Sequence, residues 1–223
     1  MCGRIANTLP SDAMAQLFSA TPANNLPSVP NFNVCPTTGI HVVMGADPNS
    51  ADSTRRLVQM RWGFIPHWYK APNDGPLLIN ARAETLAEKP AFRMACRERR
   101  CLIPVTGYYE WTKDDAGKRW PWYIHSDAPL ALAGIWQDWS QGGENLRCCA
   151  VVTIGSNIKL SQIHHRMPVV IAQDNWDLWL GEQGHGAARL MQPADDDLLS
   201  FHAVDPKVNS NKASGPELIE PFE

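Results

Sequence analysis

Short runs of apolar and β-branched residues, bounded by turn residues, are the commonest pattern along the chain and predict β-strands. Residues 114–117 and 141–144 are rich in Asp and Gly and predict hairpin turns, and a polar loop is expected at 47–53. The strands that the pattern predicts are residues 41–44, 56–62, 101–111, 120–125, 130–136, 147–154 and 167–171.

Helical periodicity is confined to short segments, which lie at residues 11–18, 84–100 and 175–180. Ser11 and Asp174 are the predicted N-caps of the first and the last segment, and Pro90 interrupts the second. The Pro- and Asn-rich residues 22–36 predict an irregular connection. Strands therefore dominate, and the helices are short.

This order of elements predicts an α+β fold in one domain spanning residues 1–223. We expect a curved, largely antiparallel, barrel-like β-sheet with short flanking helices. The chain has 223 residues, of which 44% are hydrophobic and 19% charged, enough to fill one large core. It shows no apolar run of transmembrane length and no signal-peptide pattern, so we expect a cytoplasmic protein.

The charge and the cysteines narrow the class of protein. The formal net charge of −3 argues against a protein that coats nucleic acid nonspecifically, and it leaves room for a local basic site. The 6 cysteines form no Cys-x-x-Cys pair, which suits neither a zinc knuckle nor a disulfide scaffold. Cys101, Cys148 and Cys149 are expected to be core residues.

Cys2 carries the most reactive chemistry that the sequence suggests. Removal of Met1, usual before a small side chain, would leave Cys2 with a free α-amine and a thiol on one residue. These groups titrate near about 8 and about 8.5, so each keeps a reactive minor form at neutral pH. Such a 1,2-aminothiol condenses with an aldehyde to an imine, and the thiol then closes a thiazolidine. The alternative is that Cys2 is only a small residue at a frayed end.

Three polar side chains stand in apolar or aromatic surroundings: Asn80, Glu110 and His164. Glu110 lies between Tyr109 and Trp111, so burial would raise its pKa and suit it to proton transfer. Alternation along the strand would equally place Glu110 on the solvent face. His164 precedes a predicted strand and could be either a functional or a hydrogen-bonded structural residue.

Metal and cofactor chemistry is not predicted. His164 and His165 are adjacent and expected to diverge, and the sequence has neither a metal-binding helix motif nor a Gly-rich phosphate loop. Residues 61–68 instead interleave aromatic and basic side chains, a composition that can stack unpaired bases and hold phosphates. Many tryptophans in such a chain simply fill the core.

Six short stretches, in order, resemble the SOS response-associated peptidase, or abasic-site-processing, family. They are Met-Cys-Gly-Arg at 1–4, Phe-Asn-Val-Cys-Pro-Thr at 32–37, Arg-Trp-Gly-Phe-Ile-Pro-His-Trp at 61–68, Ile-Asn-Ala-Arg-Ala-Glu-Thr at 79–85, the Gly-Tyr-Tyr-Glu-Trp stretch ending 101–111, and Ile-His-His-Arg-Met-Pro at 163–168. With the ending at 216–221, the resemblance covers nearly the whole chain.

The resemblance implies a protein that senses abasic sites in single-stranded DNA, including junctions with duplex, and forms a covalent crosslink through Cys2. It implies that Asn80 orients Cys2, that Glu110 moves protons at the amine and thiol and assists reversal, and that His164 acts on the sugar. It also implies lyase-type and autopeptidase activity, and association with the nucleoid when the protein is bound to DNA. We expect no cofactor, and a monomer as the default for a protein that acts on one lesion. The residues implied to contact DNA are Arg4, Asn33, Trp62, Pro66, Trp68, Arg82 and Arg166.

Two rival interpretations remain open. N-terminal-nucleophile glutamine amidotransferases also expose a catalytic cysteine after Met1, but they need an Asn-Gly oxyanion loop, and this sequence has no Asn-Gly dipeptide. A non-covalent module for single-stranded or modified DNA would use Trp62, Trp68 and the arginines alone. Its binding would be reversible, salt-sensitive and independent of Cys2.

Overall fold

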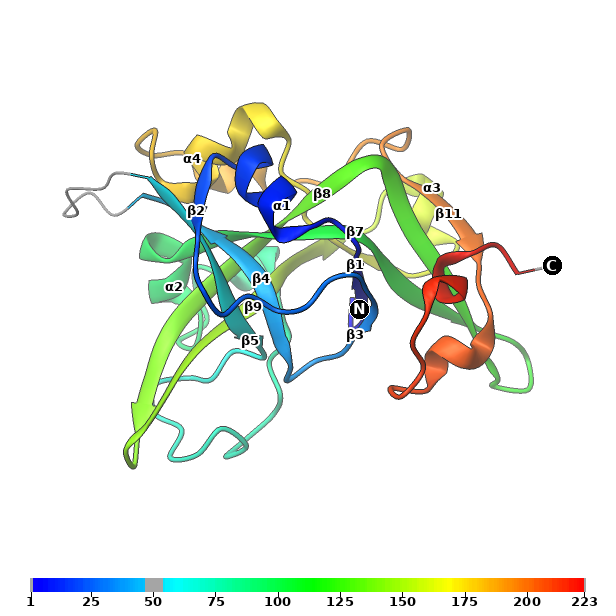
Figure 1. Cartoon of the computed structure of the whole chain (residues 1–223), viewed down its shortest axis with the longest axis horizontal. Helices are drawn as coiled ribbons and strands as arrows, with labels where there is room; N and C mark the ends of the chain where they lie inside the picture. Colours follow the sequence, from blue (N-terminus) through cyan, green and yellow to red (C-terminus); the bar gives the residue numbers. More distant parts are fainter. Residues whose placement is uncertain (1, 47–53, 223) are drawn as a thin grey trace.

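The chain folds into one twisted sheet flanked by short helices (Figure 1). A computed structural model describes residues 2–46 and 54–222. The strands of this part are β1 (Ile5–Asn7), β2 (Ala20–Pro22), β3 (Asn31–Val34), β4 (Gly39–Met44), β5 (Arg55–Trp62), β6 (Asn80–Arg82), β7 (Arg100–Lys113), β8 (Arg119–Gln141), β9 (Glu144–Gly155), β10 (Arg166–Pro168) and β11 (Ser200–Ala203).

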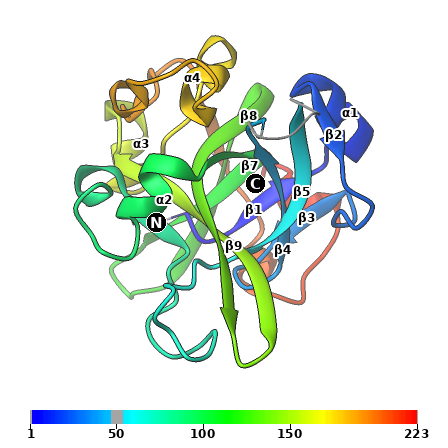
Figure 2. The same ribbon diagram turned by 90° about the vertical axis from the view of Figure 1, so that its left-hand side faces the viewer.

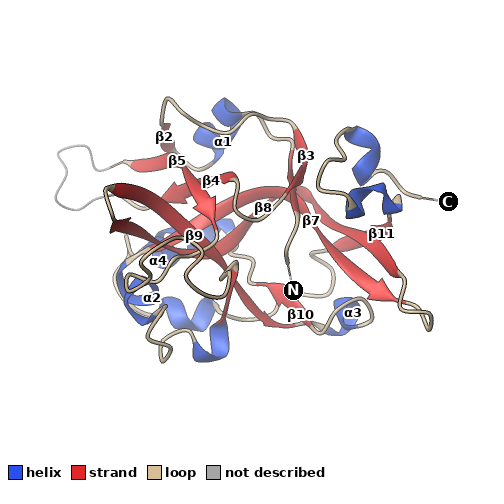
Figure 3. Cartoon of the chain, turned by 90° about the horizontal axis from the view of Figure 1, so that it is seen from below, coloured by secondary structure: helices blue, strands red, loops and turns tan. Residues whose placement is uncertain are grey.

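The helices are short and lie at the margins of the sheet (Figure 3). The α-helices are α1 (Ser11–Leu17), α2 (Arg93–Glu98), α3 (Ile158–Ser161) and α4 (Trp176–Leu180). The 3-10 turns are η1 (Ala83–Thr85), η2 (Gln173–Asn175), η3 (Ala187–Leu190), η4 (Pro206–Asn209) and η5 (Pro216–Ile219).

Five of the strands close into a ring, because β7 pairs with both β4 and β8. The order around the ring is β8, β9, β5, β4, β7 and back to β8. Within the ring β5 and β9 run parallel, and the other neighbours are antiparallel. Figure 2 shows these strands curving around a common interior. The predicted α+β fold with a curved, largely antiparallel, barrel-like sheet is confirmed.

β7 and β8 are longer than the ring requires, and their far halves build the support for β1. Their register shifts between Val105 and Gly107, and such a bulge bends a strand pair and increases its twist. Gly107 permits this bend because a Cβ there would lie 2.4 Å from the Tyr123 ring. Beyond the bulge, β1 pairs with β7 and β3 pairs with β1, while β11 pairs with β8. The start of the chain is thereby fixed against the sheet.

Alternate residues of the ring strands face two separate apolar clusters, as the two-residue period of a strand requires. The inner cluster fills the ring and includes Trp62, Ile103 and Leu132. The outer cluster packs the opposite face against α1, α2 and α4 and includes Phe18 and Trp179. Because apolar burial is the main driving force of folding, these two clusters hold the ring together. Cys2 belongs to the inner cluster.

Most predicted strands are observed, but the strand predicted at 167–171 ends at Pro168, and the short strands β1, β2, β6 and β11 were not predicted. Two further differences concern β8 and β3. The runs 120–125 and 130–136 are one continuous strand, β8, because β7 pairs with both halves on either side of the bulge. Residues 22–36 were expected to be irregular, yet they contain β3, which pairs with β1. Both hairpin turns are confirmed by the pairing of their flanking strands. The polar loop predicted at 47–53 lies outside the described residues.

The predicted helix details were less accurate. Only the turn η1 and the helix α2 form within 84–100, because Pro90 separates them and Arg100 already belongs to β7. Ser11 is the first residue of α1 rather than its cap, and its hydroxyl instead contacts the His41 ring at 3.2 Å. Asp174 lies inside η2, and α4 has no side-chain cap. Cys101, Cys148 and Cys149 are buried core residues, as predicted.

The buried His41 predicts how stability depends on pH. His41 is 3% exposed, and burial lowers its pKa from 6.5 to about 4. Between those values the unfolded chain binds the proton and the folded protein does not, so stability falls as the pH is lowered through this window. We expect His41→Gln to remove up to about 1.4 kcal/mol of this loss per pH unit. Urea unfolding of both proteins between pH 4.5 and 7.5 measures it.

The difference in unfolding free energy between wild type and His41→Gln isolates the contribution of His41 to the pH dependence of stability. Burial raises the pKa of Glu110 to about 7, so that carboxyl contributes a loss of stability as the pH rises, which is the opposite sign. This contribution is common to both proteins and cancels in their difference. Equal slopes of unfolding free energy against pH in the two proteins would contradict the prediction.

In the part of the chain that the structure describes, none of the helices combines the length and the apolar character that crossing a membrane requires.

Candidate active site around Cys2

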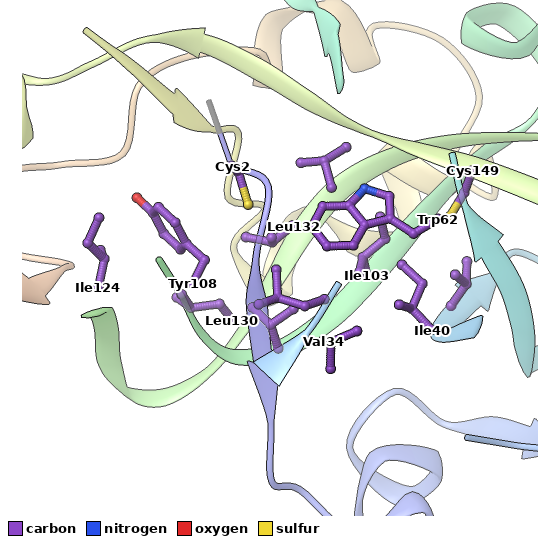
Figure 4. Packing of buried hydrophobic residues seen from close by; sticks show 14 of the residues in the cluster. Cys2, Val34, Ile40, Trp62, Ile103, Tyr108, Ile124, Leu130, Leu132 and Cys149 are labelled. Carbon is purple, nitrogen blue, oxygen red and sulfur yellow. The ribbon is translucent and has the colours of Figure 1, made fainter. Parts of the chain in front are cut away.

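Cys2 enters the protein interior just before β1, and only 1% of its surface is exposed. Figure 4 shows its sulfur among the inner-cluster side chains, near Tyr108, Leu132 and Trp62. Burial raises the pKa of the Cys2 thiol well above its usual range, and the nearby Glu110 carboxylate raises it further. The thiol is therefore held in its neutral form and needs a base before it can act as a nucleophile.

Asn80 holds the backbone of Cys2 in place. It begins β6, which runs parallel to β9, with Asn80 beside Val151. Its Nδ2 donates a hydrogen bond of 2.8 Å to the Cys2 carbonyl. The other end of the amide, Oδ1, is buried and has no hydrogen-bond partner among the described residues. An unused acceptor beside Cys2 suits a donor that arrives with a reaction, such as a free amine.

Glu110 is a buried carboxyl on β7, 3% exposed, so the alternative of a solvent-facing strand residue is wrong. Burial raises its pKa from 4.5 to about 7, while Arg119 on β8 acts in the opposite direction. A carboxyl with a pKa near neutrality is present in both protonation states at physiological pH. It can therefore accept and return a proton, as a general acid–base group must.

His164 follows α3 and precedes β10. Its Nδ1 contacts the Arg166 backbone twice, at 3.0 Å from the N–H, which donates to it, and at 3.2 Å from the carbonyl oxygen. Burial lowers the pKa of His164, so the neutral form is favoured. The His164 and His165 rings stack with centroids 4.4 Å apart, so the expectation that they diverge was wrong. Consecutive residues can stack here because the chain turns sharply into β10.

Two arginines lie at the end of β9 close to Asn80. Arg82 pairs in register with Thr153, and its side chain is exposed. Arg166 is opposite Gly155 on β10, and its guanidinium donates to both Glu84 carboxylate oxygens, at 2.5 and 3.0 Å. This pairing holds the pKa of Glu84 at about 2. The Arg166 side chain is only 10% exposed and is preorganised by a carboxylate, the geometry that also binds a phosphate.

Arg4 and Asn33 lie on the other side of β1, bonded to the C-terminal segment. Arg4 Nη1 donates to the Val208 carbonyl at 2.8 Å and to Asn33 Oδ1 at 2.5 Å. Asn33 Nδ2 donates to the carbonyls of Ser210 and Ala213, at 3.0 and 2.7 Å. These bonds tie the strand that follows Cys2 to residues 208–213. Both side chains are engaged in this network. Their contacts with DNA stay predictions.

The two tryptophans and the proline that are implied to contact DNA differ in how exposed their side chains are. Trp62 is fully buried, and its Nε1 donates to the Ile79 carbonyl at 3.0 Å. The expectation that it offers a flat face to DNA was therefore wrong, because alternation along β5 directs its ring into the inner cluster. Pro66 is also buried. Trp68 is 48% exposed, with the His67 ring at its edge, and is accessible to a nucleotide.

The sheet thus brings together most of the candidate residues that lie far apart in the sequence. Asn80 contacts Cys2 directly, Glu110 acts on the Cys2 thiol through its charge, and His164 lies between Ile163 and Met167 of the same inner cluster. Sequence analysis missed the partner of Arg166, Glu84, and the buried hydroxyl of Tyr108. Tyr108 stands two residues before Glu110, and that spacing on a strand would have placed both on one face.

Metal ligands do not gather in the described residues, where no three His, Cys, Asp or Glu side chains are grouped as ligands of one ion.

Comparison with known proteins extends over the whole chain. The sequence profile of the SOS response associated peptidase (SRAP) family matches residues 1–211. The abasic site processing protein YoqW of Bacillus subtilis is 35% identical over 99% of both chains. The abasic site processing protein YoaM of the same organism is 36% identical over 86% of this chain and 85% of its own. The abasic site processing protein HMCES of Mus musculus is 28% identical over 99% of this chain and 76% of its own.

Solved structures show the same fold. A crystal structure of a protein from Bacteroides thetaiotaomicron superposes with a TM-score of 0.85 over 100% of both chains, at 22% identity. One from Bordetella bronchiseptica has a TM-score of 0.78 over 92% of this chain and 100% of its own, at 23% identity. The resemblance of the sequence motifs is confirmed by these matches. The chain belongs to the SOS response associated peptidase (SRAP) family.

Proposed function

We propose that this protein processes abasic sites in single-stranded DNA by forming a covalent crosslink through Cys2. Its curated relatives in the family are abasic site processing proteins. The observation that carries the proposal is the position of Cys2, which is buried beside a carboxyl of raised pKa and held through its carbonyl by Asn80. Such an arrangement positions one residue for attack on an electrophile.

The reaction needs a free α-amine on Cys2, so Met1 is removed first, either by the protein itself or by an aminopeptidase. The abasic deoxyribose opens to an aldehyde at C1′. The amine attacks this carbon, a C–N bond forms, and the aldehyde oxygen leaves as water to give an imine. The thiol sulfur then bonds to the same carbon, and the thiol proton passes to the nitrogen. The product is a thiazolidine, and one molecule of water is released overall.

Burial determines the order of these steps. The Cys2 thiol is kept neutral by its surroundings, so the amine reacts before the sulfur. Glu110, whose pKa is raised to about 7, takes the thiol proton as sulfur attacks and returns it to the nitrogen. In the reverse direction the same group protonates the leaving sulfur. A carboxyl that stayed ionised at all working pH values could not perform both transfers.

Asn80 and His164 complete the site in this proposal. The unused Asn80 Oδ1 accepts a hydrogen bond from the freed α-amine and directs its lone pair toward the lesion. In the proposed tautomer the His164 Nδ1 accepts from the Arg166 backbone N–H, and the protonated Nε2 donates to the ring oxygen or hydroxyl of the sugar and favours the open aldehyde. Each role uses a bonding capacity that the structure leaves available or fixes by a backbone contact.

Arg82 and Arg166 bind phosphates next to the lesion in this proposal, and Trp68 stacks on a neighbouring base. We expect Arg82→Ala and Arg166→Ala each to weaken binding to single-stranded DNA and to reduce the slope of log K against log salt by about 0.7 to 1. Arg147→Ala is the control, because Arg147 forms a similar bidentate pair with Asp138 on the β8–β9 hairpin. Fluorescence anisotropy at several salt concentrations measures the slopes.

An unchanged salt slope in both Arg82→Ala and Arg166→Ala would contradict these phosphate contacts. The Arg166 variant also frees Glu84, so Arg166→Ala combined with Glu84→Gln separates loss of the cation from exposure of an unpaired carboxylate. If phosphate binding is the role of Arg166, the double variant keeps the reduced slope.

Finer aspects of the activity stay predictions from the sequence. These are a preference for junctions with duplex, a lyase-type strand cleavage, self-cleavage before Cys2, a monomeric state, and a cytoplasmic location with association to the nucleoid. Lyase chemistry would follow from the imine, which makes the neighbouring C2′ proton acidic, and fast ring closure by the thiol would suppress it.

The test of the proposed function is a denaturing gel. Protein whose Met1 has been removed, as checked by mass, is mixed with single-stranded DNA carrying one abasic site, and matched DNA without the lesion is the control. The expected result is a heat-stable band of reduced mobility with the lesion alone. Binding of both DNAs in a native gel without any heat-stable band would refute the crosslink and favour the non-covalent DNA-binding module.

A further inference from the structure

Tyr108 carries a buried hydroxyl that the roles above do not use. Its side chain is 0% exposed, and its oxygen has no hydrogen-bond partner among the described residues. Buried polar groups in native proteins are nearly always hydrogen-bonded, because leaving one unpaired is unfavourable. An unpaired hydroxyl in the interior therefore calls for a functional explanation.

The hydroxyl lies on the reactive face of β7. Tyr108 and Glu110 are two residues apart on this strand, so their side chains project from the same face. Ile5 of β1 pairs with Tyr108, which brings the residues before β1, including Cys2, over that face. Figure 4 shows the Tyr108 ring beside the Cys2 side chain. Both Cys2 and Glu110 act electrostatically on the phenol.

The next residue provides a natural comparison. Tyr109 projects from the opposite face of β7, and its hydroxyl donates a hydrogen bond of 2.7 Å to the Phe32 carbonyl. Its ring packs with Tyr123, Val204 and Leu218, away from the inner cluster. Two consecutive tyrosines of one strand thus differ in a single respect that matters here. The hydroxyl of Tyr109 is bonded within the fold, and that of Tyr108 is not.

We propose that the Tyr108 hydroxyl is the hydrogen-bond donor that holds the Glu110 carboxylate in position while Cys2 reacts. This inference rests on the proposed function, and it makes Tyr108 a positioning residue that acts through Glu110. A phenol is neutral over the working pH range and has one proton to donate. Among the described residues, the charged or titratable groups that act on Glu110 or on which it acts are Cys2, Tyr108 itself and Arg119 of β8, and the N-terminal amine also lowers the Glu110 pKa.

A donor to a carboxylate stabilises its charged form. Removing the Tyr108 hydroxyl should therefore raise the pH at which Glu110 loses its proton and becomes a base. The crosslinking rate of Tyr108→Phe should rise with pH along a curve displaced upward by about one unit, the effect of losing one hydrogen bond to a charged group. At a pH below the wild-type midpoint this displacement corresponds to a rate about tenfold lower.

The experiment compares wild type, Tyr108→Phe and Tyr109→Phe. Crosslinking rates with abasic single-stranded DNA are measured from pH 5.5 to 8.5, and each protein is also melted. We expect Tyr108→Phe to shift the midpoint without lowering Tm, because it removes an unpaired polar atom. We expect Tyr109→Phe to lower Tm without shifting the midpoint. An unshifted midpoint in Tyr108→Phe, or equal shifts in both variants, would overturn the proposal.

A second measurement tests the hydrogen bond without DNA, in the reacting form of the protein, from which Met1 has been removed. The Glu110 carboxyl of this form is titrated by NMR in protein with ¹³C-labelled glutamate, its signal assigned by its loss in Glu110→Gln. An upward shift of the Glu110 midpoint in Tyr108→Phe alone supports the hydrogen bond, and an identical midpoint refutes it. If wild-type protein formed no crosslink, the proposed function would fail, and this titration would still decide the role of Tyr108.

Discussion

Replacement of Cys2 by alanine or serine is expected to abolish the heat-stable crosslink to abasic DNA completely. Both variants keep a small second residue, so Met1 is still removed and the α-amine is still freed. The amine can form an imine with C1′, but no sulfur is present to close the ring. An imine hydrolyses on a denaturing gel. It becomes a stable adduct only after reduction by borohydride, so the two conditions distinguish imine from thiazolidine.

The control for this prediction is Cys35→Ser. Cys35 is another free cysteine near the start of the chain and is only partly buried, yet it lacks the contacts that hold Cys2. This variant should crosslink like wild type. A heat-stable, borohydride-independent adduct in Cys2→Ala, or its loss in Cys35→Ser, would contradict the assignment of Cys2 as the reacting residue.

Glu110→Gln is expected to slow crosslink formation by about 10²- to 10⁴-fold, the usual contribution of a positioned acid–base group. Wild-type protein should react faster as the pH rises through about 7, where Glu110 loses its proton. The amine and thiol of Cys2 also ionise above neutrality, so the wild-type profile alone does not isolate the carboxyl. The difference between the wild-type and Glu110→Gln rate profiles isolates the contribution of the carboxyl. Single-turnover crosslinking rates from pH 5.5 to 8.5 provide this difference.

A control variant and a stability measurement test whether the effect of Glu110→Gln is specific to Glu110 and not due to unfolding. Glu144→Gln changes an exposed glutamate on the β8–β9 hairpin and should leave the profile unchanged. Glu110→Gln should be no less stable than wild type at pH 8, because the substitution removes the cost of burying a charged carboxylate. A Glu110→Gln protein that is folded and keeps wild-type rates at every pH would show that another group moves the proton.

The sheet itself was largely predictable because β-branched and apolar runs between turn residues are local signals. The hairpin turns at 114–117 and 141–144 were recognisable for the same reason. Which strands close the barrel-like sheet was not predictable, because β7 pairs with β8 along one edge and with β4 and then β1 along the other, and these pairings join segments distant in the sequence. Helix boundaries were the weakest predictions, since the segment 84–100 is divided at Pro90 and its last residue already belongs to β7.

The candidate site was identified from short motifs, but the sequence did not fix which side chains are accessible. A strand residue such as Glu110 faces either the solvent or the core, and the choice depends on strands that are distant in the sequence. For the same reason the sequence did not predict that Trp62 is completely buried. DNA contact by Arg4 stays a prediction, and its bond to Val208, a partner that lies 204 residues away in the chain, was not foreseen. Such long-range contacts leave no local pattern.

The intact mass of the product is the most direct test of a thiazolidine at Cys2. Wild-type protein is reacted with an abasic oligonucleotide and analysed without reduction. The predicted mass is that of the chain without Met1 plus the DNA strand, less one molecule of water, and the adduct should contain no alkylatable Cys2 thiol after unfolding. A product whose Cys2 thiol remains alkylatable, or whose chain retains Met1, would contradict the thiazolidine.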